Sequence, residues 1–233
     1  MNAAVIIPVY NHEQRIAEVI RQALKLGLPL FVIDDGSTDS TPQIISDIPG
    51  ISVIRHPLNL GKGAALRTGF AAAVEQGCDW ALTIDGDGQH RPEDSGSLLQ
   101  AVADGRRAIV VGRREGMVGK NVPWTSRFGR GFSNFWVWVS GGPLIKDSQS
   151  GFRLYPLPEA LHLGVKATRY QFEVEVLVRA RQKGINTVEA PVRVVYQAKG
   201  ERVSHFQPWL DFRRNSATFS RLIWERIFGV SRS

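Results

Sequence analysis

Two aspartates, Asp85 and Asp87, stand one residue apart and are followed by Gln89. They come directly after residues 80–84, an apolar run with the length and composition of a buried strand. Carboxylates that crowd together repel each other and lose hydration unless a cation or a donor compensates them. Their oxygens, with the amide of Gln89, are the hard ligands that magnesium or manganese prefers. This pattern predicts a divalent-metal site, although the two aspartates alone would also suit a polar turn.

Two further acidic segments follow apolar runs in the same way. Residues 10–13 (YNHE) come after residues 3–9, and residues 34–39 (DDGSTD) come after residues 30–33. Ligands of parallel α/β sheets bind outside the carboxyl ends of the strands, where such segments gather. We therefore expect all three acidic segments to meet at one edge of a sheet.

The first 112 residues alternate short apolar runs with longer stretches of helical spacing. The runs are apolar throughout, as in strands that are buried on both faces of a parallel sheet. This order predicts an α/β fold with a doubly wound, mostly parallel sheet and helices on both faces. The expected strands are residues 3–9, 30–33, 51–54, 80–84 and 108–111, and the expected helices are 13–26, 41–47, 63–76 and 92–104.

The pattern changes after Gly112. Residues 113–145 are rich in glycine, arginine and aromatic residues, and a helix (170–182) and a strand (185–196) follow them. The last predicted element is an amphipathic helix, residues 208–228. The residues expected on its apolar face are Phe212, Phe219, Ile223 and Ile227.

The order of several motifs resembles family 2 glycosyltransferases of the GT-A fold. A further segment, DSQSGFR at residues 147–153, resembles the dolichyl- or polyprenyl-phosphate mannose and glucose synthase branch. The resemblance covers roughly residues 3–200. The motifs of the larger family are IIPVYN at 6–11, VIDDGSTD at 32–39, NLGKG at 59–63 and DGDGQH at 85–90.

This resemblance implies a metal-dependent, inverting transfer of a hexose from a GDP- or UDP-sugar. It implies that Asp85, Asp87 and Gln89 hold Mg²⁺ or Mn²⁺ on the donor diphosphate, so that Asp87 also counts as a catalytic residue. The nucleotide itself is expected to contact residues from the first strands and from the helix after residues 59–63. These expected contacts are Pro8, Tyr10 and Glu13 for the pocket, Asp35 for the base or ribose, and Arg67 for the nucleotide side.

The residues that are not assigned to the donor or the metal are compatible with two kinds of acceptor. A polyprenyl or dolichyl phosphate is already ionised and needs cations rather than a base, and Arg113, Arg114 and Arg153 are the expected cations. A hydroxyl of a sugar or another small or lipid acceptor would need a base, and Asp147 is the candidate by its position in the motif. Glu173 and Glu175, on the next predicted helix, are second choices, and a solvated or structural role is the alternative for both.

Positive charge is concentrated in two segments. Residues 113–130 and 199–233 each carry a net charge of +4 by residue count, out of +7 for the whole chain. Both also contain tryptophan and phenylalanine, a combination typical of an interfacial helix on an anionic membrane. Packing of these rings inside the fold or against a second copy is the alternative. A basic protein without catalysis, binding nucleic acid or membrane, would leave the three acidic segments unexplained, so we expect no nucleic-acid partner.

The domain division follows from these segments. We expect a catalytic domain in residues 1–200, with a nucleotide-binding half (1–112) and an acceptor half (113–200), and a basic helix in residues 201–233. Cys78 is the single cysteine, which excludes an intramolecular disulfide. Apolar runs stay shorter than the roughly 18 residues of a membrane span. We therefore expect a cytoplasmic protein that can dock peripherally on the cytoplasmic face of the membrane.

Overall fold

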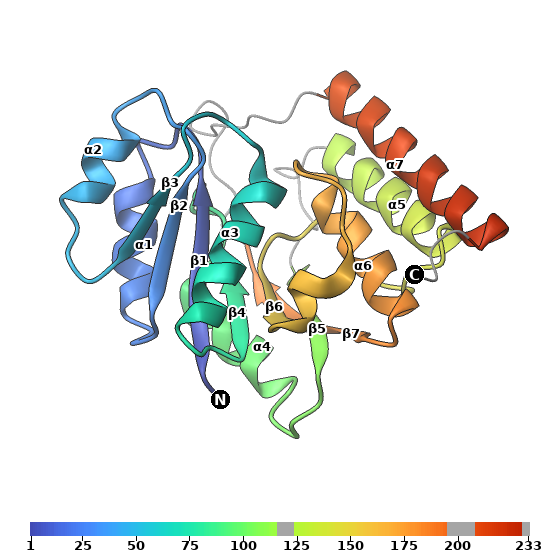
Figure 1. Cartoon of the computed structure of the whole chain (residues 1–233), viewed down its shortest axis with the longest axis horizontal. Helices are drawn as coiled ribbons and strands as arrows, with labels where there is room; N and C mark the ends of the chain where they lie inside the picture. The colour runs from blue at the N-terminus through green and yellow to red at the C-terminus, as the bar shows by residue number, and fades with distance from the viewer. Residues whose placement is uncertain (116–123, 195–207, 230–233) are drawn as a thin grey trace.

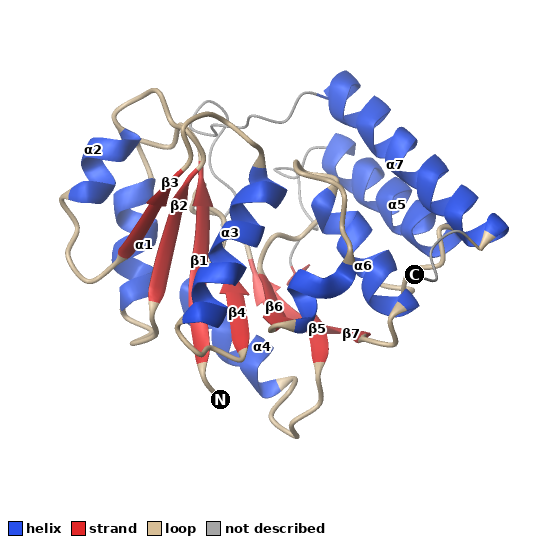
Figure 2. Cartoon of the chain, in the orientation of Figure 1, coloured by secondary structure: helices blue, strands red, loops and turns tan. Residues whose placement is uncertain are grey.

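A seven-stranded sheet with helices on both faces forms the body of the protein (Figures 1 and 2). The computed structural model describes residues 1–115, 124–194 and 208–229. In chain order the elements are β1 (Ala3–Val9), α1 (Ile16–Leu24), β2 (Leu30–Asp34), α2 (Thr41–Ser46), β3 (Ser52–Arg55), α3 (Lys62–Glu75), β4 (Trp80–Thr83), the 3₁₀ turn η1 (Pro92–Asp94), α4 (Ser95–Gln100), β5 (Ala108–Glu115), α5 (Trp124–Val139), β6 (Arg153–Pro156), the 3₁₀ turn η2 (Glu159–Leu163), α6 (Phe172–Gln182), β7 (Asn186–Arg193) and α7 (Pro208–Phe228).

The strands lie in the order β3-β2-β1-β4-β6-β5-β7. All neighbouring strands are parallel except β6, which runs antiparallel to both β4 and β5. Every residue of β1, β2 and β4 is buried, as expected for apolar runs covered on both faces. The predicted α/β fold with a doubly wound, mostly parallel sheet is therefore confirmed.

Each face of the sheet has its own apolar core. On one face α3, α6, α5 and α7 contribute side chains such as Phe70, Phe172, Val137 and Phe219. On the other face α1, α2 and α4 contribute Ile16, Ile20, Ile45 and Leu98. The spacing of the buried α1 residues, at positions 16, 19, 20 and 23, is the helical spacing seen in the sequence.

Several predicted elements need correction. The third strand is exposed along most of its length, because it forms the sheet edge and pairs only with β2. The helix expected at 92–104 is a 3₁₀ turn followed by α4, which already ends at Gln100. The prediction omitted β6, whose four residues begin with the fully buried Arg153 and so do not form an apolar run.

The C-terminal helix α7 forms as predicted, but its buried face differs. Phe219 and Leu222 are buried, whereas Ile227 is 68% exposed. The ring of Trp136 in α5 stacks on Phe219 with centroids 6.3 Å apart, so α5 and α7 lie side by side (Figure 1). Within the described ranges no helix combines the length and the apolar character that crossing a membrane requires.

Ion pairs fasten α7 to α6. Glu225 of α7 pairs with Arg179 of α6, and Arg221 of α7 donates to the fully buried Glu175 over 2.7 Å. Lys166 adds a 3.3 Å contact to Glu225. Burial alone would raise the pKa of Glu225, but Arg179 and Lys166 more than offset it, so the pKa lies below its usual value. The positive charge of α7 is thus partly used inside the protein.

We predict that Glu225→Gln lowers the free energy of unfolding by about 1–2 kcal/mol at pH 7, since Arg179 loses one of its two carboxylate partners and keeps only Glu175. A lowered pKa stabilises the fold above the unfolded pKa of about 4.5, and this contribution is lost as the pH falls through the folded pKa. Urea unfolding measures the free energy of unfolding of the wild type and of Glu225→Gln, and the difference between the two proteins should be smaller at pH 4 than at pH 7. Glu75→Gln, at an exposed position in α3, is the control. An equal loss at both pH values would contradict the prediction.

Candidate active site

Hydrogen bonds join the loops after β1 and β2. The backbone N–H of Asn11 donates to Ser37 Oγ over 3.0 Å, and Asn11 Oδ1 accepts the N–H of Thr38 over 2.8 Å. The carboxylate of Glu13 accepts the backbone N–H of Ser40 over 2.9 Å. Two of the three acidic segments therefore meet at the carboxyl ends of the strands, as predicted, and Tyr10 lies in the loop between Pro8 and Glu13.

Asp35 fixes the start of α3. Its Oδ1 accepts the N–H of Leu60 over 3.0 Å, and its Oδ2 accepts the N–H of Gly61 over 2.8 Å. His56 Nδ1 lies 2.7 Å from Oδ1. Gly61 has a φ of 101°, a conformation that favours glycine. The predicted contact of Asp35 with a base or ribose stays a prediction, while its hold on this loop is a role that the motif did not indicate.

Lys62, the first residue of α3, links two carboxylates. Its Nζ lies 2.6 Å from Asp85 Oδ1 and 2.5 Å from Glu173 Oε1. Burial alone would lower the pKa of Lys62, but the two carboxylates raise it well above its usual value. For the carboxyl group of Asp85 burial acts in the other direction and would raise the pKa, yet Lys62 and His90 hold this pKa below its usual value. Both Lys62 and Asp85 are therefore charged at neutral pH.

The turn after β4 fits a divalent cation. Asp87 Oδ1 accepts the N–H of Gln89 over 3.0 Å, which orders the turn. The side chain of Asp85 is 22% exposed, so the ionised carboxylate can be reached from solvent. Among the described residues no three His, Cys, Asp or Glu side chains form a closed metal cluster. Asp85, Asp87 and Gln89 would therefore share the ion with water or phosphate oxygens, the usual arrangement for Mg²⁺.

The segment 147–153 lies directly against this turn. Thr83 Oγ1 at the end of β4 donates to the carbonyl of Gly151 over 2.7 Å. A Cβ atom built on Gly151 would lie 2.3 Å from Asp85 Oδ2 and 2.7 Å from Lys62 Nζ. A side chain at this position would push the ends of Asp85 and Lys62 aside, so the close approach favours glycine. Asp85 and Gly151, which are 66 residues apart in the sequence, thus lie in one site.

Arg153 shapes the segment from within. It is fully buried, and its guanidinium donates to the carbonyls of Ser148, Ser150 and Glu173 over 2.7, 2.7 and 2.8 Å. These bonds hold the loop before β6 against the start of α6. The structure therefore gives Arg153 a positioning role, which differs from the direct phosphate contact expected from the sequence.

Asp147 is fully buried and bonded to Arg114. Arg114 Nε and Nη2 donate to its two oxygens over 2.7 and 2.8 Å, and the backbone N–H of Arg114 adds a 3.2 Å bond. A carboxylate held by a guanidinium at both oxygens is a weak candidate for a general base. Arg113 pairs with Glu115 over 2.9 Å, and its side chain is 32% exposed. The structure thus places Arg114 beside the segment 147–153, whereas the ion pair of Arg113 is with Glu115.

Arg67 is bonded within the fold. Its Nη1 donates to the carbonyls of Val165 and Ala167 over 3.1 Å each, which ties α3 to the loop before α6. The expected approach of Arg67 to the nucleotide stays a prediction, while its hold on this loop is a role that the motif did not indicate. Glu173, the second-choice base, pairs with Lys62 instead.

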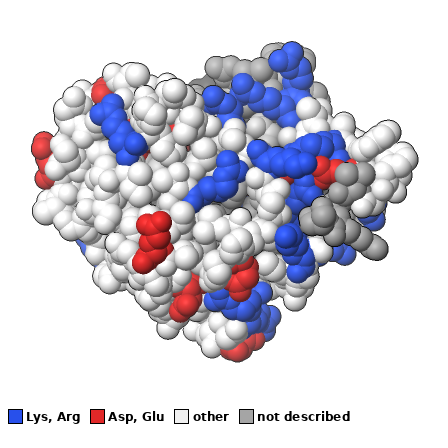
Figure 3. Space-filling model, in the orientation of Figure 1, with Lys and Arg blue, Asp and Glu red and all other residues white. Residues whose placement is uncertain are grey.

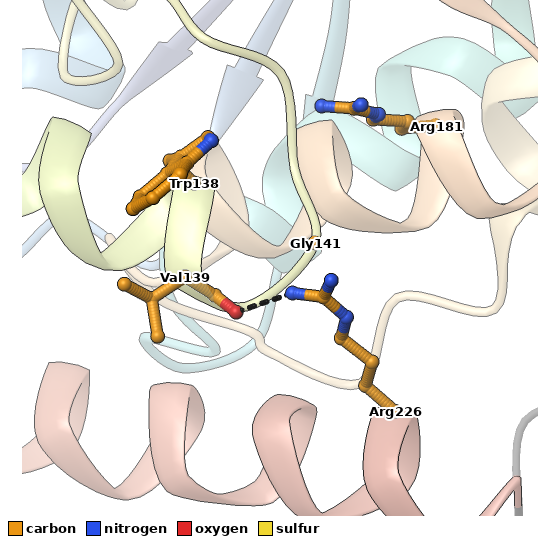
Figure 4. A pocket seen from close by; sticks show the side chains of 5 residues that line it. All are labelled: Trp138, Val139, Gly141, Arg181 and Arg226. Carbon is orange, nitrogen blue, oxygen red and sulfur yellow. Dashed lines mark hydrogen bonds between the residues drawn. The ribbon is translucent and has the colours of Figure 1, made fainter.

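A pocket of about 460 Å³ lies elsewhere, between the C-terminal ends of α5, α6 and α7 (Figure 4). Arg226 donates to the carbonyl of Val139 over 2.7 Å at its rim. None of the strand-end residues lines it, so it is separate from the candidate active site. Its lining residues are Trp138, Val139, Gly141, Arg181 and Arg226.

Comparison with known proteins places this arrangement in context. Residues 4–156 match the family model described as "Glycosyl transferase family 2". The chain is 32% identical over 212 residues to UDP-N-acetylglucosamine--dolichyl-phosphate N-acetylglucosaminyltransferase from Methanococcus voltae, covering 82% of this chain and 84% of that protein. It is 29% identical over 213 residues to undecaprenyl-phosphate mannosyltransferase from Micrococcus luteus, covering 86% of each.

A solved structure supports the fold. Mannosyl-3-phosphoglycerate synthase from Rubrobacter xylanophilus superposes with a TM-score of 0.66 at 18% sequence identity. The superposition covers 100% of this chain and 76% of that one. At this identity the likeness concerns the fold alone, and it agrees with the predicted GT-A type of architecture.

We predict that Gly151→Ala weakens the binding of GDP- or UDP-sugars in the presence of Mn²⁺ by about tenfold or more, because the new methyl group displaces Asp85 and Lys62. Isothermal titration calorimetry measures the effect. Gly96→Ala is the matched control, since a Cβ at Gly96 meets nothing within 4 Å in the short helix α4. Unchanged binding by a folded Gly151→Ala protein would show that the close approach does not matter for the donor.

Proposed function

Because the chain belongs to glycosyl transferase family 2, we propose that it moves a hexose from a GDP- or UDP-sugar to a polyprenyl or dolichyl phosphate. Two similar proteins carry such an acceptor in their names, dolichyl phosphate in one and undecaprenyl phosphate in the other. The observation that carries the proposal is the contact between Gly151 and Asp85, which joins the carboxylate turn to the segment 147–153. Donor and acceptor groups would meet there.

The donor side uses the ends of β1, β2 and β4. We propose that Pro8, Tyr10 and Glu13 line the nucleotide pocket. Asp85, Asp87 and Gln89 would hold Mg²⁺ or Mn²⁺, and Asp85 is kept ionised by Lys62. A bound divalent ion offsets the negative charge that develops on the departing diphosphate.

The acceptor side favours a phosphate over a hydroxyl. A phosphate monoester is ionised at neutral pH, so its oxygen attacks without a base. In the proposed step this oxygen bonds to the anomeric carbon on the face opposite the leaving diphosphate, and the bond between that carbon and the diphosphate breaks with its electron pair leaving on the diphosphate. Asp147 orients Arg114 rather than accepting a proton, and Arg113 and Arg114 provide positive charge near the phosphate.

We further propose that the chain docks from the cytoplasmic side onto an anionic membrane, where a lipid phosphate acceptor would lie. Figure 3 shows that many of the Lys and Arg side chains on this face gather over the half that contains α6 and α7. Trp224 and Phe228 lie one helical turn apart, with ring centroids 4.1 Å apart. Exposed aromatic rings beside arginines suit the interface of a bilayer with anionic lipids. Where the structure describes side chains in α5 and α7 (residues 129–139 and 213–228), the large exposed apolar ones are Phe135, Trp138, Trp224, Ile227 and Phe228.

The transfer reaction can be tested directly. The protein is incubated with Mn²⁺, a panel of GDP- and UDP-sugars, and a short-chain polyprenyl phosphate, and the glycolipid product is measured. We expect transfer from one donor and a loss of at least about 100-fold in Asp87→Asn, because the developing charge on the diphosphate is no longer offset. Release of diphosphate with a hydroxyl acceptor, and none with the polyprenyl phosphate, would contradict the proposed acceptor.

The role of Asp147 separates the two acceptors in the same assay. Loss of a general base costs about 10²–10⁴-fold in rate. With a phosphate acceptor we expect Asp147→Asn to keep kcat within about tenfold and to raise mainly the KM for the acceptor, since Arg114 loses its orienting partner. A fall of kcat into the range for a lost base would favour the hydroxyl acceptor.

Membrane docking predicts a specific binding defect. Wild-type protein should sediment with vesicles in which about one third of the lipid is phosphatidylglycerol. The double variant Trp224→Ser, Phe228→Ser should bind several-fold less, because it buries less apolar area in the interface. Val53→Thr, a change on the exposed edge strand β3, is the control. Equal sedimentation of all three proteins, or no sedimentation of the wild type, would argue against this surface.

A further inference from the structure

Asp85 already has a cation within the protein. Lys62 Nζ lies 2.6 Å from its Oδ1, and the ammonium side chain is only 17% exposed. The backbone of Gly151 approaches the other oxygen, since a Cβ at Gly151 would lie 2.3 Å from Oδ2. The carboxylate that heads the proposed metal site is thus enclosed by a lysine and a glycine.

A divalent ion on Asp85 would be repelled by this ammonium group. Charges of the same sign a few ångströms apart repel strongly in a partly buried site. Glu173 offers Lys62 a second carboxylate at 2.5 Å, so the ammonium keeps a partner when its bond to Asp85 weakens. A nucleoside diphosphate would bring further negative charge next to Lys62. The geometry therefore makes Lys62 sensitive to both the ion and the diphosphate.

We propose that Lys62 competes with the divalent ion for Asp85, so that the ion binds tightly only together with a nucleoside diphosphate. This inference depends on the metal-dependent donor binding proposed above. Lys62 then acts as a positioning residue: it holds Asp85 in place without the donor, and with the donor it pairs with Glu173 and a phosphate oxygen. The ion and the nucleotide bind cooperatively as a consequence.

Manganese binding without any turnover tests this competition. Free Mn²⁺ is measured by electron paramagnetic resonance for the wild type and Lys62→Met, each with and without GDP or UDP. Without nucleotide we expect Lys62→Met to bind Mn²⁺ about tenfold more tightly, because the competing ammonium is gone. The increase in Mn²⁺ affinity caused by the nucleotide should shrink by about the same factor.

The controls separate competition from general charge effects. Lys146→Met removes the same charge from an exposed residue and should leave Mn²⁺ affinity within about twofold. Lys62→Gln, which keeps a hydrogen-bond donor, serves as a second variant if Lys62→Met does not fold by circular dichroism. We expect it to shift Mn²⁺ affinity in the same direction.

Two different results would overturn the inference, and they distinguish a failure of the competition from a failure of the metal-dependent donor site. Unchanged or weaker Mn²⁺ binding in the folded Lys62 variants, with normal nucleotide-dependent binding in the wild type, overturns the competition alone. A wild-type protein that binds no Mn²⁺ even with GDP or UDP overturns the metal-dependent donor site as well.

Discussion

The contact between the backbone of Gly151 and the carboxylate of Asp85 constrains the whole site. It brings a loop from the second half of the chain to the end of β4, so close that a side chain at Gly151 would displace Asp85 and Lys62. Arg153 holds that loop by three hydrogen bonds to backbone carbonyls. Asp35 fixes the start of α3 by accepting the backbone N–H of Gly61. These buried polar groups are all bonded, which makes the arrangement rigid.

Much of the fold could be predicted because the strands β1, β2 and β4 are apolar on both faces. The motifs also placed the acidic segments correctly at one sheet edge. The antiparallel strand β6 could not be predicted, since Arg153 interrupts any apolar pattern and its burial depends on carbonyls of the preceding loop and of Glu173 in α6. The hydrogen-bond partners of Arg67 and Asp147 could not be predicted either. Both residues resemble ligand contacts in the sequence, but each is bonded to a residue that is distant in the chain.

Charge in this protein serves two purposes that composition does not distinguish. Arg179 and Arg221 neutralise carboxylates that are buried, and such pairs mainly fix geometry. Only the remaining cations can act on a partner outside the chain. Each such pair cancels within the net charge of +7, so the surplus positive charge that can attract an anionic surface lies on other residues.

The central place of β6 has a consequence for how the chain folds. It lies between β4 and β5, so the halves 1–112 and 113–200 share one sheet. A fragment that ended at residue 112 would expose the apolar edge of β4, which invites pairing with other chains. The two halves must form in one cooperative transition. Exchange of residues 113–200 between relatives would therefore disturb residues 1–112 as well.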